Sequence, residues 1–193
     1  ENYWLDELID FWVADPNISF NAMFLRRELI DDQTPYLFQL LLKIYLKIFG
    51  YYPEIGRQVP FLFGVLSIPL AGILSYQVSK NNSFLLTILL VSINIYLIKY
   101  SQETRTYTLV FLLSIISLIF YYKIISSDLV SFKRIYIFFL FIIFSVLALF
   151  SHPFVFIIFF SQIAYSIYSF FVFRNKNFLF LLSIPFILII YLI

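Results

Sequence analysis

Three charged side chains lie in a short polar connection between two long apolar runs. Residues 98–110 read IKYSQETRTYTLV, so Lys99, Glu103 and Arg105 are preceded by SFLLTILLVSINIYLI and followed by TLVFLLSIISLIFYY. A carboxylate held near hydrocarbon is costly unless it is paired or hydrated, so Glu103 marks either a partner or a cavity. Two interpretations stay open here: a functional site, or an ion pair of Glu103 with Lys99 or Arg105 that does no chemistry.

The spacing within this stretch favours one arrangement of its aromatic residues. Tyr100, Glu103 and Tyr107 are separated as i, i+3 and i+7, which predicts one helical face at the top of a membrane span. Asp6 and Glu7 are adjacent, so on a helix they point about 100° apart. A pair of catalytic carboxylates therefore needs a second acid from elsewhere, and Glu103 is the best candidate.

His152 is the only histidine of the chain and occurs in LFSHPFVF. Pro153 disfavours helix at the residue before it, so we expect a helix break there. The imidazole could serve as a ligand or proton carrier, or it could be a hydrogen-bonded residue at a span boundary.

The composition indicates the elements that must position these residues. The 193 residues are 62% hydrophobic and only 12% charged, which is more apolar surface than a soluble domain of this length can bury. Repeated continuous apolar runs predict an all-α polytopic membrane protein. We expect about six transmembrane helices, at roughly 58–79, 83–98, 106–122, 135–151, 154–173 and 177–193.

Residues 1–57 differ from the bundle predicted over 58–193. They contain most of the acidic residues, and they include PYLFQLLLKIYLKIFG, which begins at Pro35. Gln39, Lys43 and Lys47 recur every four residues and form one polar stripe, which predicts an amphipathic helix in the membrane interface. Trp4 and Trp12 are expected to be interface anchors.

Every second connection of the predicted bundle is basic, namely 80–82, 123–134 and 174–176. Basic loops mark the cytoplasmic side, so 1–57, 99–105 and 151–153 are expected on the extracytoplasmic side. The polar segments WLDELID, DDQTP, KYSQETRTY and SHPF then share one membrane face.

Several segments in this order resemble glycosyltransferase family 39. They are the acidic pair DE, the block from TPYLF to KIFG, IGRQVPFLFGVLSIPL, YSQETRTY and SHPF, and together they cover nearly all of the chain. Members of this family are polytopic enzymes that take a sugar from a polyprenyl-phosphate carrier, and they include protein O-mannosyltransferases and aminoarabinose transferases. The resemblance implies a glycosyltransferase of the cell envelope, in a bacterial inner membrane. Attack of the acceptor on the side opposite the phosphate would invert the anomeric carbon.

The resemblance also implies roles for individual residues. The acidic motif of the family falls on Asp6 and Glu7, with Asp6 as the general base, and the acid of a later loop falls on Glu103. Arg105 resembles a basic residue near the donor phosphate, with Arg57 or Lys99 as helpers. Other candidate site residues are Tyr100, Tyr107, Asp32 and His152.

The expected partners are the lipid-linked sugar donor, a lipid, glycan or protein acceptor, and the bilayer, with no nucleic acid. A divalent metal ion stays open, because Glu103 and His152 are suitable ligands but two ligands do not make a site. A transporter or flippase of a lipid-linked sugar is the alternative function; collection of polar groups at one face favours the enzyme. We expect the chain to be the amino-terminal part of a longer enzyme, lacking a first span, and such a piece could be inactive alone.

Overall fold

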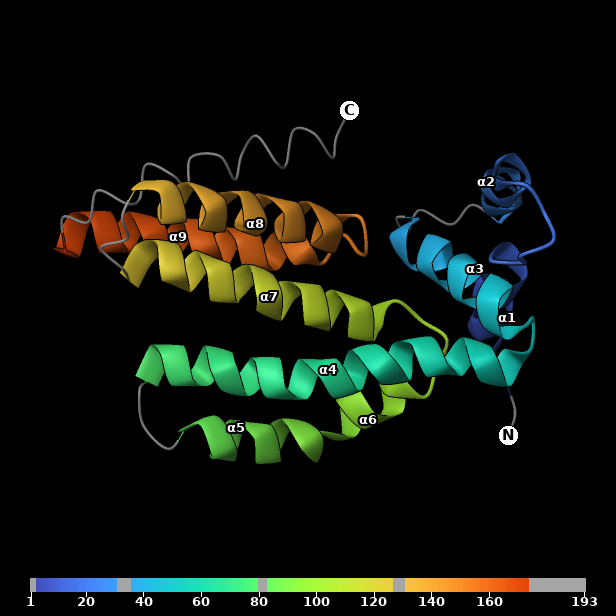
Figure 1. Cartoon of the computed structure of the whole chain (residues 1–193), viewed down its shortest axis with the longest axis horizontal. Helices are drawn as coiled ribbons and strands as arrows, with labels where there is room; N and C mark the ends of the chain where they lie inside the picture. Colours follow the sequence, from blue (N-terminus) through green and yellow to red (C-terminus); the bar gives the residue numbers. More distant parts are fainter. Residues whose placement is uncertain (1–2, 31–35, 80–82, 127–130, 174–193) are drawn as a thin grey trace.

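The computed structural model describes residues 3–30, 36–79, 83–126 and 131–173, and all regular elements in these ranges are helices. Three short helices come first, and six longer or apolar helices follow (Figure 1). The helices are α1 (Leu5–Val13), α2 (Phe20–Leu29), α3 (Leu37–Phe49), α4 (Pro53–Ser79), α5 (Ser83–Ser92), α6 (Ile95–Ser101), α7 (Tyr107–Ser126), α8 (Ser131–Leu149) and α9 (Val155–Phe173).

Three of these helices, α4, α7 and α9, are long and apolar enough to cross a membrane. At 27 residues, α4 is about 40 Å long, which exceeds the hydrocarbon thickness of a bilayer. The pair α5 and α6 is bent by 57° and makes a fourth span if it is counted as one. The described part of the chain is therefore compatible with a multi-pass integral membrane protein.

The predicted spans match these helices to different degrees. The spans expected at 58–79, 106–122 and 154–173 correspond to α4, α7 and α9. The span expected at 135–151 corresponds to α8, but its apolar part, Ile135–Leu149, is shorter than a typical crossing. The span expected at 177–193 lies outside the described residues.

The span expected at 83–98 is broken in the middle. Asn94 lies between α5 and α6 with an extended backbone, and its side-chain oxygen accepts a hydrogen bond from Leu97 N at 3.0 Å. Asparagine competes with the helical backbone in this way and favours a helix start over a helix interior. The break therefore turns α6 away from the line of α5.

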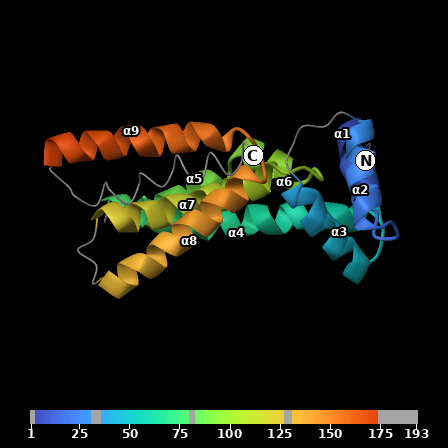
Figure 2. The same ribbon diagram turned by 90° about the horizontal axis from the view of Figure 1, so that it is seen from above.

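Helices α1, α2 and α3 form a cap at one end of the helical bundle, as both views show (Figures 1 and 2). The α6–α7 turn and the α8–α9 turn lie at the same end. Hydrogen bonds join them, since Leu37 N donates to Phe150 O at 3.2 Å and the Thr106 hydroxyl donates to Ser151 O at 3.1 Å. The described polar segments thus share one end of the bundle, as the alternation of loops predicts.

Two residues of the polar stripe of α3, Gln39 and Lys43, face the protein, whereas the third, Lys47, is exposed. Gln39 and Lys43 are buried, whereas Ile44, Ile48 and Phe49 are exposed. The Lys43 ammonium donates to the carbonyls of Asp15 and Ile18, and burial lowers its pKa. Because a buried ammonium needs acceptors, Lys43 binds the loop after α1.

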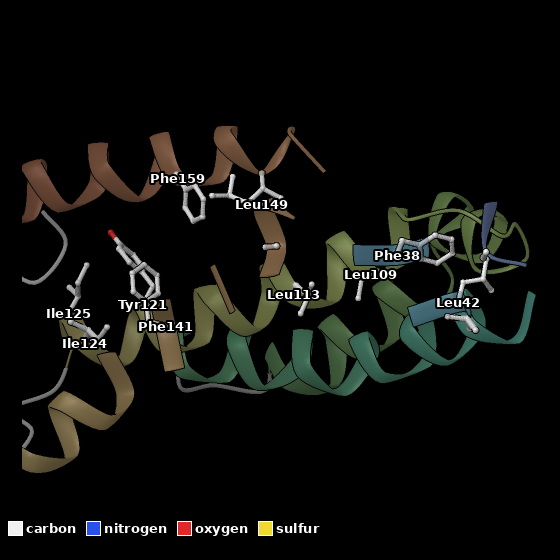
Figure 3. Close-up of a cluster of buried hydrophobic side chains, with 14 of the residues drawn as sticks. Phe38, Leu42, Leu109, Leu113, Tyr121, Ile124, Ile125, Phe141, Leu149 and Phe159 are labelled. Atoms are coloured by element: carbon white, nitrogen blue, oxygen red, sulfur yellow. The ribbon is translucent and has the colours of Figure 1, made fainter. Parts of the chain in front are cut away.

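The core lies between α7, α8, α9 and the inner face of α3. Phe38 and Leu42 of the cap belong to the same buried cluster as Leu109 and Leu113 of α7 and Phe159 of α9 (Figure 3). Apolar packing therefore anchors the cap to the bundle. This differs from helix pairs inside lipid, which gain little from hydrophobic burial. This packing places α1 next to the α6–α7 turn.

Gly64 allows α4 to approach α6 closely. A Cβ built on Gly64 would lie 3.0 Å from Ser101 Cβ, whereas one on Gly56 would meet its neighbours at 3.5 Å. We expect Gly64→Ala to be less stable than Gly56→Ala by about 1–3 kcal/mol, because overpacking offsets the helix propensity that both variants gain. Thermal unfolding of the two variants in the same detergent measures the difference. Equal stabilities would show that α4 and α6 can move apart at Gly64 without a loss of stability.

Candidate functional site

Glu7 joins three segments that are distant in the sequence. The carboxylate is only 1% exposed, and it accepts bonds from Arg57 of α4 at 3.0 and 2.9 Å. Thr104 N in the α6–α7 turn donates to the same carboxylate at 2.8 Å, and Trp4 N donates at 3.2 Å. A buried carboxylate with this many donors is a structural anchor that holds α1 against α4 and the turn.

The pKa of Glu7 reflects these partners. Burial by itself would raise the pKa, but the hydrogen bonds from Arg57, Thr104 and Trp4 and the charge of Arg57 lower it overall. Glu7 is therefore ionised throughout the neutral range. Since all its donors are protein groups, Glu7 is better placed to position Asp6 than to accept a proton from a substrate.

Asp6 is adjacent to Glu7 but faces the other way, toward Arg105. The Asp6 side chain is 64% exposed, and its Oδ2 lies 3.1 Å from Arg105 Nη1. Arg105 also donates to the Tyr107 hydroxyl at 3.4 Å. Burial alone would lower the pKa of Arg105, but Tyr107 and the carboxylates of Asp10 and Asp6 raise it, so the guanidinium stays charged.

Lys99 and Glu103 complete the charged groups at the α6–α7 turn. Lys99 Nζ lies 3.9 Å from Glu103 Oε1, and the Lys99 side chain is 55% exposed. The ammonium also lies 6.0 Å from the ring of Trp4 and 5.7 Å from the ring of Tyr100. Of the two ion pairs proposed for Glu103, the structure shows the one with Lys99, while Arg105 pairs with Asp6.

The helical face predicted for Tyr100, Glu103 and Tyr107 is wrong. Helix α6 ends at Ser101, residues 102–106 form a turn, and α7 begins at Tyr107. The chain reverses there because Glu7 and Ser151 bind the turn at Thr104 and Thr106. The rings of Tyr100 and Tyr107 still meet, at 4.6 Å between centroids, but from two different helices.

Two polar cavities are both lined by the Asp6–Arg105 pair. The first, called here the Lys99 cavity, has a volume of about 200 Å³ and is lined by Trp4, Asp6, Glu7, Lys99, Tyr100, Glu103, Arg105 and Tyr107. The second, called the Asp10 cavity, measures about 280 Å³ and is lined by Asp6, Ile9, Asp10, Ile30, Gln39, Arg105, Thr106, Tyr107 and His152. Asp6, Arg105 and Tyr107 belong to both.

A third, mainly apolar groove adjoins the Lys99 cavity. It measures about 360 Å³ and is lined by Leu90, Val91, Asn94, Tyr96, Leu97, Tyr100, Tyr107, Thr108 and Phe111. Tyr100 and Tyr107 line both spaces. The groove is lined by residues from both sides of the bend between α5 and α6, so the break at Asn94 shapes an apolar groove beside the Lys99 cavity.

His152 lies at the break between α8 and α9, as Pro153 predicts. Its Nδ1 accepts a hydrogen bond from Phe154 N at 3.2 Å, and its ring lies 6.0 Å from that of Tyr107. It lines the Asp10 cavity. The α8–α9 turn thus brings His152 to the same cavity as Asp6.

Two residues of this region were not predicted as site residues, Asp10 and Gln39. Asp10 is 7% exposed and Gln39 is 3% exposed, and Gln39 Nε2 donates to Asp10 Oδ1 at 2.6 Å. The i, i+4 spacing of Asp6 and Asp10 places both on one face of α1 and was the available signal. The pairing with Gln39 depends on how α3 packs across α1, which no local pattern contains.

The other predicted residues are placed as follows. Arg57 is committed to Glu7 and also lies under the Tyr3 ring at 4.1 Å; it is not among the residues that line the two polar cavities. Asp32 lies outside the described residues. Within the described ranges, no three His, Cys, Asp or Glu side chains come close enough to hold a metal ion.

Comparisons of the chain with models of known protein families, with curated proteins and with solved structures found no match.

Proposed function

We propose that the chain belongs to a membrane glycosyltransferase that moves a sugar from a polyprenyl-phosphate carrier to an acceptor hydroxyl, on the extracytoplasmic side and with inversion. The observation that carries this proposal is the Asp6–Arg105 pair, a carboxylate and a cation at 3.1 Å where two polar cavities meet. The resemblance to glycosyltransferase family 39 falls on the same residues.

The arrangement suits a ligand with an anionic head and an apolar tail. Arg105 and Lys99 line the Lys99 cavity, where a phosphate can form ion pairs with both side chains. The adjoining groove is apolar and open toward the exposed side chains of Leu90 and Tyr96, so an isoprenoid chain can lie in it. The two tyrosines shared by these spaces would cover the junction of head and tail.

The same geometry accounts for transfer. Asp6 takes the proton of the acceptor hydroxyl, whose oxygen forms a bond to the anomeric carbon on the face opposite the phosphate. The bond between that carbon and the phosphate oxygen breaks, and the polyprenyl phosphate leaves with the electron pair. Arg105 and Lys99 stabilise the charge that develops on it.

Arg105 links the two halves of this reaction. In the structure its guanidinium pairs with the Asp6 carboxylate, whose side chain is 64% exposed. A donor phosphate that binds Arg105 competes for this contact and leaves the Asp6 carboxylate available to the acceptor. Glu103 positions Lys99, and Glu7 fixes the helix that carries Asp6.

The charge distribution favours an enzyme over an ion-coupled transporter. In the described part of the chain, the buried charged side chains are Glu7, Asp10, Arg27 and Lys43, all in the cap. The buried polar groups of α7, α8 and α9 are hydroxyls and the amide of Gln162. Transporters place ionisable groups near the membrane midplane, and the described spans bury none there.

We also propose that the cap rests against the outer membrane interface. Leu5, Leu8 and Trp12 form an exposed apolar face of α1, and Trp4 and Trp12 are the only tryptophans of the chain. In lipid nanodiscs, brominated phospholipids are expected to quench the fluorescence of Trp12 strongly, measured in Trp4→Phe protein. Quenching by aqueous iodide with none by brominated lipid would place α1 in water.

Binding of the carrier tests the proposed donor class. We expect Arg105→Gln to lower the affinity of the complete protein for polyprenyl phosphate by about tenfold or more, because one charge-assisted contact to phosphate is lost. Native mass spectrometry of protein released from nanodiscs measures this. Arg26→Gln is the matched control, since Arg26 pairs with Asp15 away from the cavities. Equal loss in both variants, or none in Arg105→Gln, rejects the assignment.

A further inference from the structure

We propose that the Asp10 cavity is the acceptor subsite and that the acceptor it takes is a neutral sugar, bound through several of its hydroxyls. The role of the cavity as an acceptor subsite rests on the proposed function, while the class of ligand follows from the cavity itself. The cavity shares Asp6 and Arg105 with the Lys99 cavity, but Lys99 does not line it.

Hydrogen-bonding groups from α1 and α3 form one wall of the cavity. Gln39 Nε2 donates to Asp10 Oδ1 at 2.6 Å, and Arg27 Nη1 approaches Gln39 Oε1 at 3.4 Å. Arg27 is held in turn by the Tyr36 ring, 4.1 Å away. This chain of contacts fixes which end of the Gln39 amide faces Asp10, so a preorganised carboxylate–amide pair faces the cavity.

The charges of the two cavities differ. Both contain Asp6 and Arg105. The Lys99 cavity adds the ammonium of Lys99, together with Glu103, which pairs with that ammonium, and Glu7, which pairs with Arg57. Among its described lining residues, the Asp10 cavity adds the carboxylate of Asp10 and no further cation. An anionic ligand is therefore disfavoured beside Asp6 and Asp10, and a neutral ligand with donor hydroxyls is favoured. Carboxylates accept hydrogen bonds from hydroxyl groups, and side-chain amides both accept and donate hydrogen bonds.

The number and spread of these groups indicate a sugar instead of a single serine or threonine hydroxyl. Asp6 and Asp10 come from α1, Gln39 from α3, Thr106 from the α6–α7 turn and His152 from the α8–α9 turn. One hydroxyl needs one base, but a ring with several hydroxyls uses polar partners on more than one side. Ile9, Ile30 and Tyr107 supply the apolar surface that the carbon face of a sugar would cover.

The test uses soluble methyl glycosides as probes, because they read the subsite without any donor. Saturation-transfer NMR of the complete protein in nanodiscs is run with methyl β-glucoside, methyl β-galactoside and methyl α-mannoside. We expect at least one to bind, and we expect Asp10→Asn to weaken it by about tenfold through loss of a charge-assisted hydrogen bond. Polyprenyl phosphate binding should be unchanged in this variant.

A second pair of variants tests the cavity without replacing Asp10, Gln39 or Arg27, whose hydrogen bonds are buried. Ile30→Trp should fill the cavity and abolish the glycoside signal. Leu25→Trp, on an exposed face of α2, the helix that ends just before Ile30, should retain it. An unchanged signal in Ile30→Trp overturns the proposal. So does wild-type protein that binds a threonine-containing tripeptide at this cavity and no glycoside.

The outcomes separate this inference from the proposed function. Glycoside binding that Ile30→Trp removes supports the subsite even if the protein releases no sugar from polyprenyl phosphate, which would overturn only the glycosyltransferase. Sugar release from the carrier without any glycoside binding overturns only the subsite.

Discussion

Replacing Asp6 with asparagine is expected to abolish sugar transfer while leaving the protein folded in the membrane. The amide keeps the size of the side chain but cannot take the proton of the acceptor, and a general base contributes roughly 10²–10⁴-fold to a rate. Because Asp6 is exposed and its partner Arg105 is partly exposed, the fold depends little on this ion pair. The assay is release of labelled sugar from polyprenyl phosphate by the complete protein.

Asp15→Asn is the matched control for this prediction. Asp15 is an acid of the same cap, paired with Arg26 at 3.4 Å, and it is not among the residues lining the polar cavities. Its variant should transfer sugar at the wild-type rate. Normal turnover in Asp6→Asn would remove Asp6 from the mechanism.

Glu7→Gln is expected to destabilise the protein by about 3 kcal/mol, with loss of activity as a consequence. Removing one partner of a buried ion pair leaves Arg57 without its counter-charge. The amide also keeps only one acceptor oxygen, so either Arg57 Nε and Thr104 N or Arg57 Nη2 and Trp4 N would face an NH2 group. Glu54→Gln is the control, since Glu54 is exposed and its side chain accepts a hydrogen bond from the Tyr3 hydroxyl at 3.2 Å. Thermal unfolding of both variants measures the effect.

The pH dependence of stability provides an independent check on Glu7. Its pKa in the folded protein is lowered, so its contribution is fully present above the ordinary glutamate pKa of about 4.3 and is lost as the pH falls below that value. Wild-type protein should therefore lose more stability than Glu7→Gln on acidification through this range. Parallel loss in the two proteins would show that Glu7 is not held by Arg57.

Much of the bundle could be predicted because its signals are local. Continuous apolar runs located α4, α7 and α9, and Pro153 located the break at His152. Asn94 carried a signal for the α5–α6 break, but an apolar run across it resembles one span. A continuous apolar run predicts a span but does not indicate whether that span is bent.

The cap and the site depended on contacts that periodicity does not contain. The stripe of Gln39 and Lys43 predicted a polar face but not the partners that it meets, Asp10 and the carbonyls of Asp15 and Ile18. Likewise, the sequence grouped Asp6, Glu103 and Arg105 by membrane side, while the 3.1 Å pairing of Asp6 with Arg105 required the fold. The sidedness itself stays a prediction.

The most direct test of the central claim uses a polyprenyl-phosphate sugar that carries one label on the sugar and another on the phosphate. The complete protein is placed in vesicles with this donor and an acceptor glycoside, and both labels are followed. The account predicts that the sugar label moves to the acceptor while the phosphate label stays on the lipid, and that Asp6→Asn prevents the separation. Movement of both labels together across the membrane, without cleavage, would contradict it and identify a lipid transporter.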